Sequence, residues 1–181
     1  HLQSSRWSPR SWSVLSVAGA SGPHRCRPHA TTRYGGSVSI DPTEPTGIDL
    51  TTLTLCDYAN VREGLLNITS GGITRIAVHH GFPAEIEAHI AMSVYIHPHR
   101  VGEAHSGRVV LRYPDTAEDI ARIEFEFSVD AERHPGEGLN LPFALPLRTV
   151  AFPHAGQVDI SVSMDDAPAG LLTFWVIDSS V

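Results

Sequence analysis

The sequence predicts an all-β domain, an antiparallel β-sandwich of the immunoglobulin-like kind with about nine strands. Three observations support this fold class. Apolar and polar residues alternate with a period of two through most of the chain from Ile48 onward. Turn signals rich in Gly and Pro separate these stretches. Only residues 115–121 are a helix candidate, with Asp115 as its cap. A closed barrel of the lipocalin or cupin kind is the second architecture, because length and periodicity do not separate the two.

The strand boundaries follow from turn residues and from the alternation itself. Glycine readily adopts the backbone angles of tight turns, so Gly64 and the pair Gly71-Gly72 separate the first three strands. From Ile86 to Ile96 every second residue is apolar, which predicts one long strand with a buried and an exposed face. The predicted strands are residues 51–59, 65–69, 73–78, 85–96, 108–113, 121–129, 139–147, 157–164 and 171–177.

Two features place particular strands within the sheets. Pro142 and Pro146 lie in one predicted strand, and proline cannot donate a hydrogen bond to a neighbouring strand. We therefore expect that strand at a sheet edge, where prolines also discourage aggregation. The strands 108–113 and 121–129 are expected to pair as a hairpin. This pairing would bring four charged residues together as cross-strand ion pairs, namely Arg108, Arg112, Glu124 and Glu126.

Charge divides the chain into two parts. Residues 1–37 contain five arginines and no acid, whereas residues 38–181 contain eight arginines and all 20 acids. The acidic part repels phosphate groups, so we expect no nucleic-acid partner and no membrane partner. No stretch approaches the roughly 18 consecutive apolar residues of a membrane-spanning helix. We expect residues 1–45 to be a disordered or non-native N-terminal extension and residues 46–181 to be one β-sandwich domain.

Cysteine and lysine usage indicate the compartment and the source. The two cysteines, Cys26 and Cys56, are too few for a disulfide framework, and Cys26 falls in the expected extension. Reduced thiols are typical of cytoplasmic proteins, so we expect that location. All 13 cationic residues are arginine, which favours a GC-rich bacterial genome as the source.

Two stretches carry a resemblance to a known family. Residues 57–68 read Asp-Tyr-Ala-Asn-Val-Arg-Glu-Gly-Leu-Leu-Asn-Ile, and Gly71-Gly72 precedes the strand that begins at Ile73. This opening resembles that of a family of small, uncharacterised bacterial proteins, common in actinobacteria and described as a domain of unknown function. Residues 152–156, Phe-Pro-His-Ala-Gly, are similar to the family's second recognisable feature. The resemblance covers about residues 50–178 and implies an all-β domain with a boundary near residue 45, but no activity.

Histidine is the one residue type in excess, with 11 in the chain. His97, His99 and Glu103 reproduce the His-x-His-x₃-Glu core of the first cupin motif, which holds a divalent metal. Ala91 stands where that motif has glycine, and the second motif is missing, so a true cupin is disfavoured. If strands alternate in direction, three loops meet at one end of the sandwich. They would gather His97, His99, Glu103, His105, Asp130, Glu132, His134, Asp165 and Asp166.

This gathering yields the metal hypothesis and its competitor. The candidate ligands of a divalent transition metal are His97, His99, Glu103, His105 and His134. The competing interpretation is that these are ordinary polar, solvated loops of an acidic domain.

The function we expect from the sequence is binding without catalysis. Neither a nucleophile motif nor a phosphate-binding loop is present, so we expect a binding or scaffolding module that needs no cofactor. Leu171, Trp175 and Ile177 lie on one face of the last predicted strand, whose opposite face is also apolar. Such a strand is covered either by its own chain or by a partner. We therefore expect an unknown protein partner or self-association through these three residues. The alternative is a metal-binding protein or metalloenzyme that uses the five candidate ligands.

Overall fold

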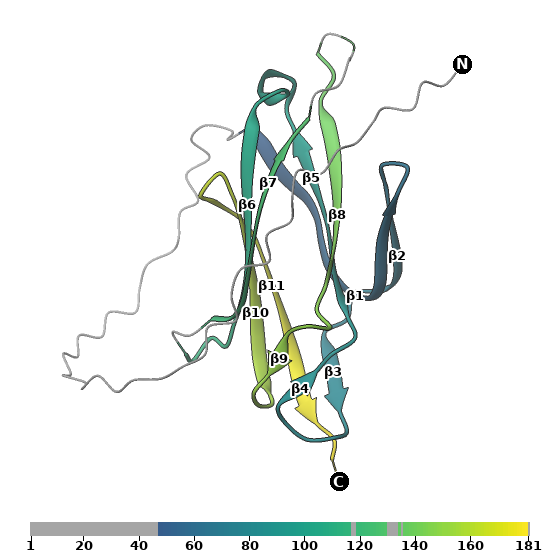
Figure 1. The fold of residues 1–181 in the computed structure, drawn as a ribbon, viewed down its shortest axis with the longest axis vertical. Coiled ribbons are helices and arrows are strands. Elements are labelled where there is room, and N and C mark those ends of the chain that lie inside the picture. Colours follow the sequence, from purple (N-terminus) through teal and green to yellow (C-terminus); the bar gives the residue numbers. More distant parts are fainter. Residues whose placement is uncertain (1–46, 117–118, 130–133, 135, 181) are drawn as a thin grey trace, which may run out of the picture.

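The computed structural model describes residues 47–116, 119–129, 134 and 136–180. In these residues the chain forms eleven strands and one short 3-10 turn, η1 (Pro98–Arg100). The longer strands run along the long axis of the molecule (Figure 1). In chain order they are β1 (Ile48–Arg62), β2 (Leu65–Gly71), β3 (Arg75–Val78), β4 (Ala84–Glu85), β5 (His89–Ile96), β6 (Ala104–Arg112), β7 (Asp119–Ser128), β8 (Leu139–Pro146), β9 (Ala151–Phe152), β10 (Gly156–Met164) and β11 (Ala167–Asp178).

Two sheets form the sandwich, and the all-β prediction is confirmed. One sheet has the strand order β2-β1-β5-β8, and the other has the order β3-β11-β10-β6-β7. A third, two-stranded sheet joins β4 to β9. All pairs are antiparallel except β3 with β11, which run parallel. β8, which carries Pro142 and Pro146, lies at a sheet edge as predicted.

The core lies between the inner faces of the two sheets. Alternate residues of β5, among them Ile90, Met92 and Val94, are fully buried, and Val158 and Ile160 of β10 face them from the other sheet. Burying one such side chain stabilises a fold by about 1.5–3 kcal/mol relative to leaving it exposed. The period of two in the sequence therefore identified the core faces of these strands.

One predicted strand is interrupted. We expected a continuous strand over residues 85–96, but only β4 and β5 are hydrogen-bonded strands, and residues 86–88 lie between them. Ile86 and Ala88 remain buried, so the alternation persists without strand pairing. β4 leaves the main sheet to pair with β9, through Ala84 opposite Phe152. This departure accounts for the strand count of eleven rather than about nine.

The predicted helical turn is wrong where the structure describes it. Asp119 begins β7, and Ala121 pairs with Leu111 of β6. Before them, the amide of Thr116 donates to the carbonyl of Tyr113 in a tight turn. Pairing with β6 outweighs the weak local preference for one helical turn. Residues 117–118 lie outside the described residues, as does the predicted N-terminal extension, residues 1–45.

The first hairpin is longer than predicted and folds back over its own sheet. β1 pairs with β5 as far as Cys56, and from there to Arg62 it pairs only with β2. Ala59 and Leu66 of this hairpin pack on Ala91 of β5, on the outward side of the sheet. The small side chains let the hairpin approach closely. The second half of β1 and β2 therefore form a partial third layer, and Figure 1 shows β2 beside β8.

Candidate functional site

The outer face of β11 exposes a strip of large apolar side chains. Phe174 and Val176 point into the core and are almost wholly buried, because successive side chains of a strand point to opposite faces. The outward residues Leu171, Trp175 and Ile177 are 66%, 48% and 37% exposed. The structure thus places all three predicted interaction residues together on one accessible face.

Register determines which residues flank this strip. On one side, Arg75 of β3 lies opposite Trp175. On the other side, Asp159 of β10 lies opposite Thr173 and accepts a hydrogen bond from its hydroxyl at 2.7 Å. Arg75 is exposed, and its side chain makes no hydrogen bond or ion pair with any residue that the structure describes. The strip is therefore bordered by a free cation on one side and an anchored carboxylate on the other.

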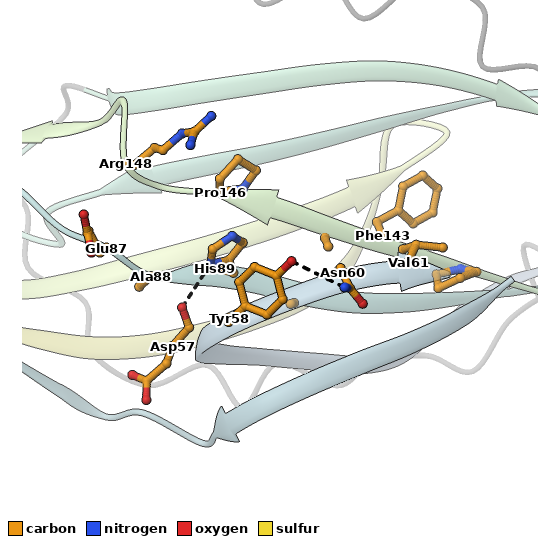
Figure 2. A pocket seen from close by; sticks show the side chains of 13 residues that line it. Asp57, Tyr58, Asn60, Val61, Glu87, Ala88, His89, Phe143, Pro146 and Arg148 are labelled. Atoms are coloured by element: carbon orange, nitrogen blue, oxygen red, sulfur yellow. Dashed lines mark hydrogen bonds between the residues drawn. The ribbon is translucent and has the colours of Figure 1, made fainter. Parts of the chain in front are cut away.

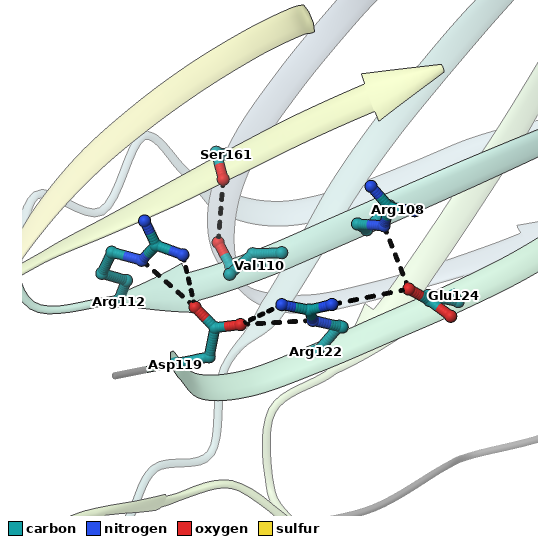
Figure 3. Close-up of polar contacts among 7 residues, drawn as sticks. All are labelled: Arg108, Val110, Arg112, Asp119, Arg122, Glu124 and Ser161. Carbon is teal, nitrogen blue, oxygen red and sulfur yellow. Dashed lines mark hydrogen bonds and ion pairs between the residues drawn. The ribbon is translucent and has the colours of Figure 1, made fainter. Parts of the chain in front are cut away.

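The same sheet carries a charged surface at its other edge, on β6 and β7. Asp119 accepts hydrogen bonds from both Arg122 and Arg112, which lie on either side of its carboxylate (Figure 3). These hydrogen bonds, that of Arg122 first, hold the pKa of Asp119 below its ordinary value. Arg108 pairs with Glu124 at 3.0 Å.

The expected ion pairs are thus confirmed in part. Arg108 does pair with Glu124, but the partner of Arg112 is Asp119. Glu126 lies opposite Ser106, two residues before Arg108. Each arginine pairs with the residue directly opposite it on β7. Because β7 begins at Asp119, two residues before the predicted strand, Asp119 is the residue opposite Arg112.

At one end of the sandwich a buried histidine joins two loops. His105 is only 3% exposed, and its Nδ1 lies 3.0 Å from a carboxylate oxygen of Asp165. Its Nε2 lies 3.1 Å from the carbonyl oxygen of Arg100, so each ring nitrogen lies within hydrogen-bond distance of an acceptor oxygen. The guanidinium of Arg100 donates to the same carboxylate at 3.0 Å, and the amide of Ser106 donates to its other oxygen at 2.8 Å.

This arrangement connects the turn between β10 and β11 to the loop that precedes β6. Burial by itself would raise the pKa of Asp165, but hydrogen bonds from Ser106 and His105 and the nearby charge of Arg100 hold it below its ordinary value. Asp165 also has a left-handed backbone, with φ of 47°, as the tight hairpin turn requires. The contacts fit a structural role, because every polar atom named is directed at another protein group.

The other candidate metal ligands do not converge on this histidine. His97 pairs with Asp49 at 2.8 Å, and Glu103 accepts a hydrogen bond from Arg100. His99 lies beside His97, with ring centroids 6.0 Å apart, and His134 is exposed. Among the residues that the structure describes, no three His, Cys, Asp or Glu side chains form a group able to hold a metal ion. Asp130 and Glu132 lie outside those residues. The described part of the chain thus lends the metal hypothesis no support.

Sequence reasoning did not anticipate a hollow beside the folded-back hairpin. It measures about 850 Å³ and lies between residues 57–61 of β1 and the outer side of β5 and β8. Tyr58 meets His89 edge to face, and His89 Nδ1 lies 3.1 Å from the carbonyl oxygen of Asp57 (Figure 2). Pro146 and Arg148 lie on the opposite side. The outward alanines on β5 and β8 were the sequence signal for a covering layer, but nothing local showed which segment covers them.

The comparisons with known proteins decide the family and leave the activity open. A family model described as a family of unknown function (DUF6941) matches residues 51–177. The chain belongs to this family. That membership confirms the resemblance to a family of unknown function and assigns no catalytic activity.

Other comparisons add little. Among curated proteins, no match is found. One matching solved structure is the Pseudomonas fluorescens alkylpurine DNA glycosylase AlkC bound to DNA containing an abasic site analog, at 10% identity and a TM-score of 0.37. The alignment covers 72% of this chain and 30% of that one, and at this TM-score it supports no argument. No helix among the described residues is long and apolar enough to cross a membrane.

Proposed function

We propose that this member of the family is a non-catalytic binding module that holds a protein partner against the outer face of β11. The observation that carries the proposal is the exposed strip formed by Leu171, Trp175 and Ile177. All three point to the same face and span residues 171–177 of the strand, roughly 20 Å, with the exposed Thr173 between Leu171 and Trp175. Clustered exposed apolar side chains are typical of interaction sites.

The composition of the strip favours a protein over a small ligand. Tryptophan contributes strongly to protein interfaces because it buries a large area at low conformational cost. A ridge on an open sheet face also lacks the concavity that encloses small molecules. The residues beside it on β10 are polar, and the one opposite Leu171 is the small Ser161, which allows close approach by another surface at that point.

The proposal extends to the compartment and the fold group. We place the module in the cytoplasm, in keeping with the free, buried thiol of Cys56. We place its source among GC-rich bacteria, since arginine supplies every cationic side chain. We group the fold with the immunoglobulin-like sandwiches, because two sheets of mainly antiparallel strands pack face to face.

Site-specific photo-crosslinking tests the binding surface. A benzophenone amino acid at position 171 should give a discrete protein adduct in the cells from which the gene comes. The same group at position 126, on the charged face of β7, serves as the matched control. We expect the adduct from position 171 only, and we expect Trp175→Glu to abolish it. Absence of any Trp175-dependent adduct at position 171 would refute the proposed function.

A further inference from the structure

We propose that the partner on this face is a second copy of the same chain, related by a two-fold axis that runs along β11. This inference rests on the proposed function, since it uses the same strip. Symmetric dimers are the commonest assemblies of identical chains, and in them one surface patch contacts itself. The strip is suited to self-contact, because Leu171, Trp175 and Ile177 would each meet their own copy across such an axis.

The charged residues on either side of the strip favour a two-fold axis along β11 over one that runs across the strands. Arg75 and Asp159 lie on opposite sides of β11, and Asp159 is displaced by two residues along the strands, about 7 Å. A two-fold axis along β11 places the β3 side of one copy over the β10 side of the other. Each Arg75 then faces the other copy's Asp159, and the dimer gains two ion pairs between the copies.

The perpendicular alternative is unfavourable. An axis across the strands would place β3 over β3 and β10 over β10. Arg75 would then approach its own copy, and so would Asp159, which puts like charges together at both sides of the strip. Like charges that face each other across an interface repel, so this arrangement of the dimer is disfavoured.

The reach of the side chains is compatible with the proposed arrangement. Face-packed sheets lie about 10 Å apart, and an extended arginine side chain spans most of that gap. Arg75 is exposed and has no partner among the described residues, so it is free to extend. Asp159 is held toward the strip by the hydroxyl of Thr173 and by the amide of Gln157, at 2.7 and 3.3 Å. One partner is thus fixed and the other adjustable.

Charge reversal in the full chain tests the arrangement by sedimentation or light scattering over a range of concentrations. We expect the wild-type chain to dimerise and Trp175→Glu to be monomeric. Arg75→Glu alone or Asp159→Arg alone should raise the dimer Kd by about tenfold, since two pairs are lost at once. The double variant should return the Kd to near the wild-type value. Arg148→Glu, an equal change of charge over the other sheet, should leave the Kd unchanged.

A folding control keeps the test decisive. Circular dichroism and melting temperature should match the wild type for each variant. Should Asp159→Arg melt early, Asp159→Asn removes the charge while keeping an oxygen for the Thr173 hydroxyl, and it should weaken the dimer by a smaller factor. A wild-type chain that stays monomeric overturns the inference. So does a dimer that Trp175→Glu leaves intact, or one whose single reversals have no effect or are not rescued.

The two proposals can fail separately. A monomeric chain that crosslinks to a different protein from position 171 retains the proposed function and refutes the second copy. A dimer that Trp175→Glu dissolves, but charge reversal does not affect, retains the face and refutes the axis along β11. No dimer and no adduct would refute both.

Discussion

Phe174 offers the most direct test of how the sandwich is held together. Its side chain is fully buried between the sheets, and it meets the ring of Phe152 edge to face, with centroids 6.2 Å apart. Phe174→Ala removes a complete aromatic ring from a close-packed core, which costs the transfer free energy of the ring and leaves a cavity. Such substitutions lower the free energy of unfolding by about 3–5 kcal/mol.

The neighbouring residue supplies a matched control. Trp175 is the next residue on the same strand but points to the outer face, where it is half exposed. Trp175→Ala removes a larger side chain, yet it should cost about 1 kcal/mol or less. Urea unfolding followed by circular dichroism, in dilute protein so that association does not contribute, gives both values. A cost for Phe174→Ala below about 1.5 kcal/mol, or equal costs for the two variants, would refute the assignment of inner and outer faces.

Three further predictions concern polar contacts and packing. The depressed pKa of Asp119 means that its stabilising contribution is present above the pKa of an unfolded carboxyl and is lost as the pH falls through the folded value. Asp119→Asn should therefore be less stable than wild type at pH 7, and the difference should shrink as the pH falls below the ordinary carboxyl pKa of about 3.9; a constant difference would contradict it. His105→Ala removes a buried ring and one polar contact each from the Asp165 carboxylate and the Arg100 carbonyl, and it should cost about 1–3 kcal/mol by urea unfolding. The exposed His99→Ala should cost almost nothing; equal costs would argue against the buried network. Gly107→Ala places a methyl group against the ring of Phe125 and should cost about 1–3 kcal/mol, and Phe125→Leu in the same chain should recover part of that loss; tolerance of the alanine would show that the ring does not cover the glycine.

Much of the fold could be predicted because alternation is a local property. The pleat of a strand directs side chains alternately, so Val158 and Ile160 could be assigned to the core without knowing what they contact. The prolines of β8 likewise place it at an edge by their own chemistry, since they lack the amide hydrogen that a central strand requires. The apolar outer face of β11 was predictable on the same grounds.

The candidate site was predictable only as a set of residues. The sequence predicted that His105 and Asp165 lie at the same end of the sandwich. They do meet there, as members of a hydrogen-bonded network within the protein. The sequence also predicted His97 as a candidate ligand beside His105, but in the structure His97 pairs with Asp49. Loop membership indicates that side chains are near one end of the fold, whereas the direction of each side chain depends on strand register and turn geometry.

The sequence by itself determined which residues face the core, which strand lies at an edge, and that one strand is apolar on both sides. Tertiary structure alone decided that β3 pairs in parallel with β11, which sets Arg75 beside Trp175. It alone decided that the β1-β2 hairpin folds back over Ala91. The physical reason is that the alternation of apolar and polar residues depends on a few neighbouring residues, whereas strand partners are separated by up to about a hundred residues along the chain. Their choice depends on the summed packing of both sheets, which no local pattern records.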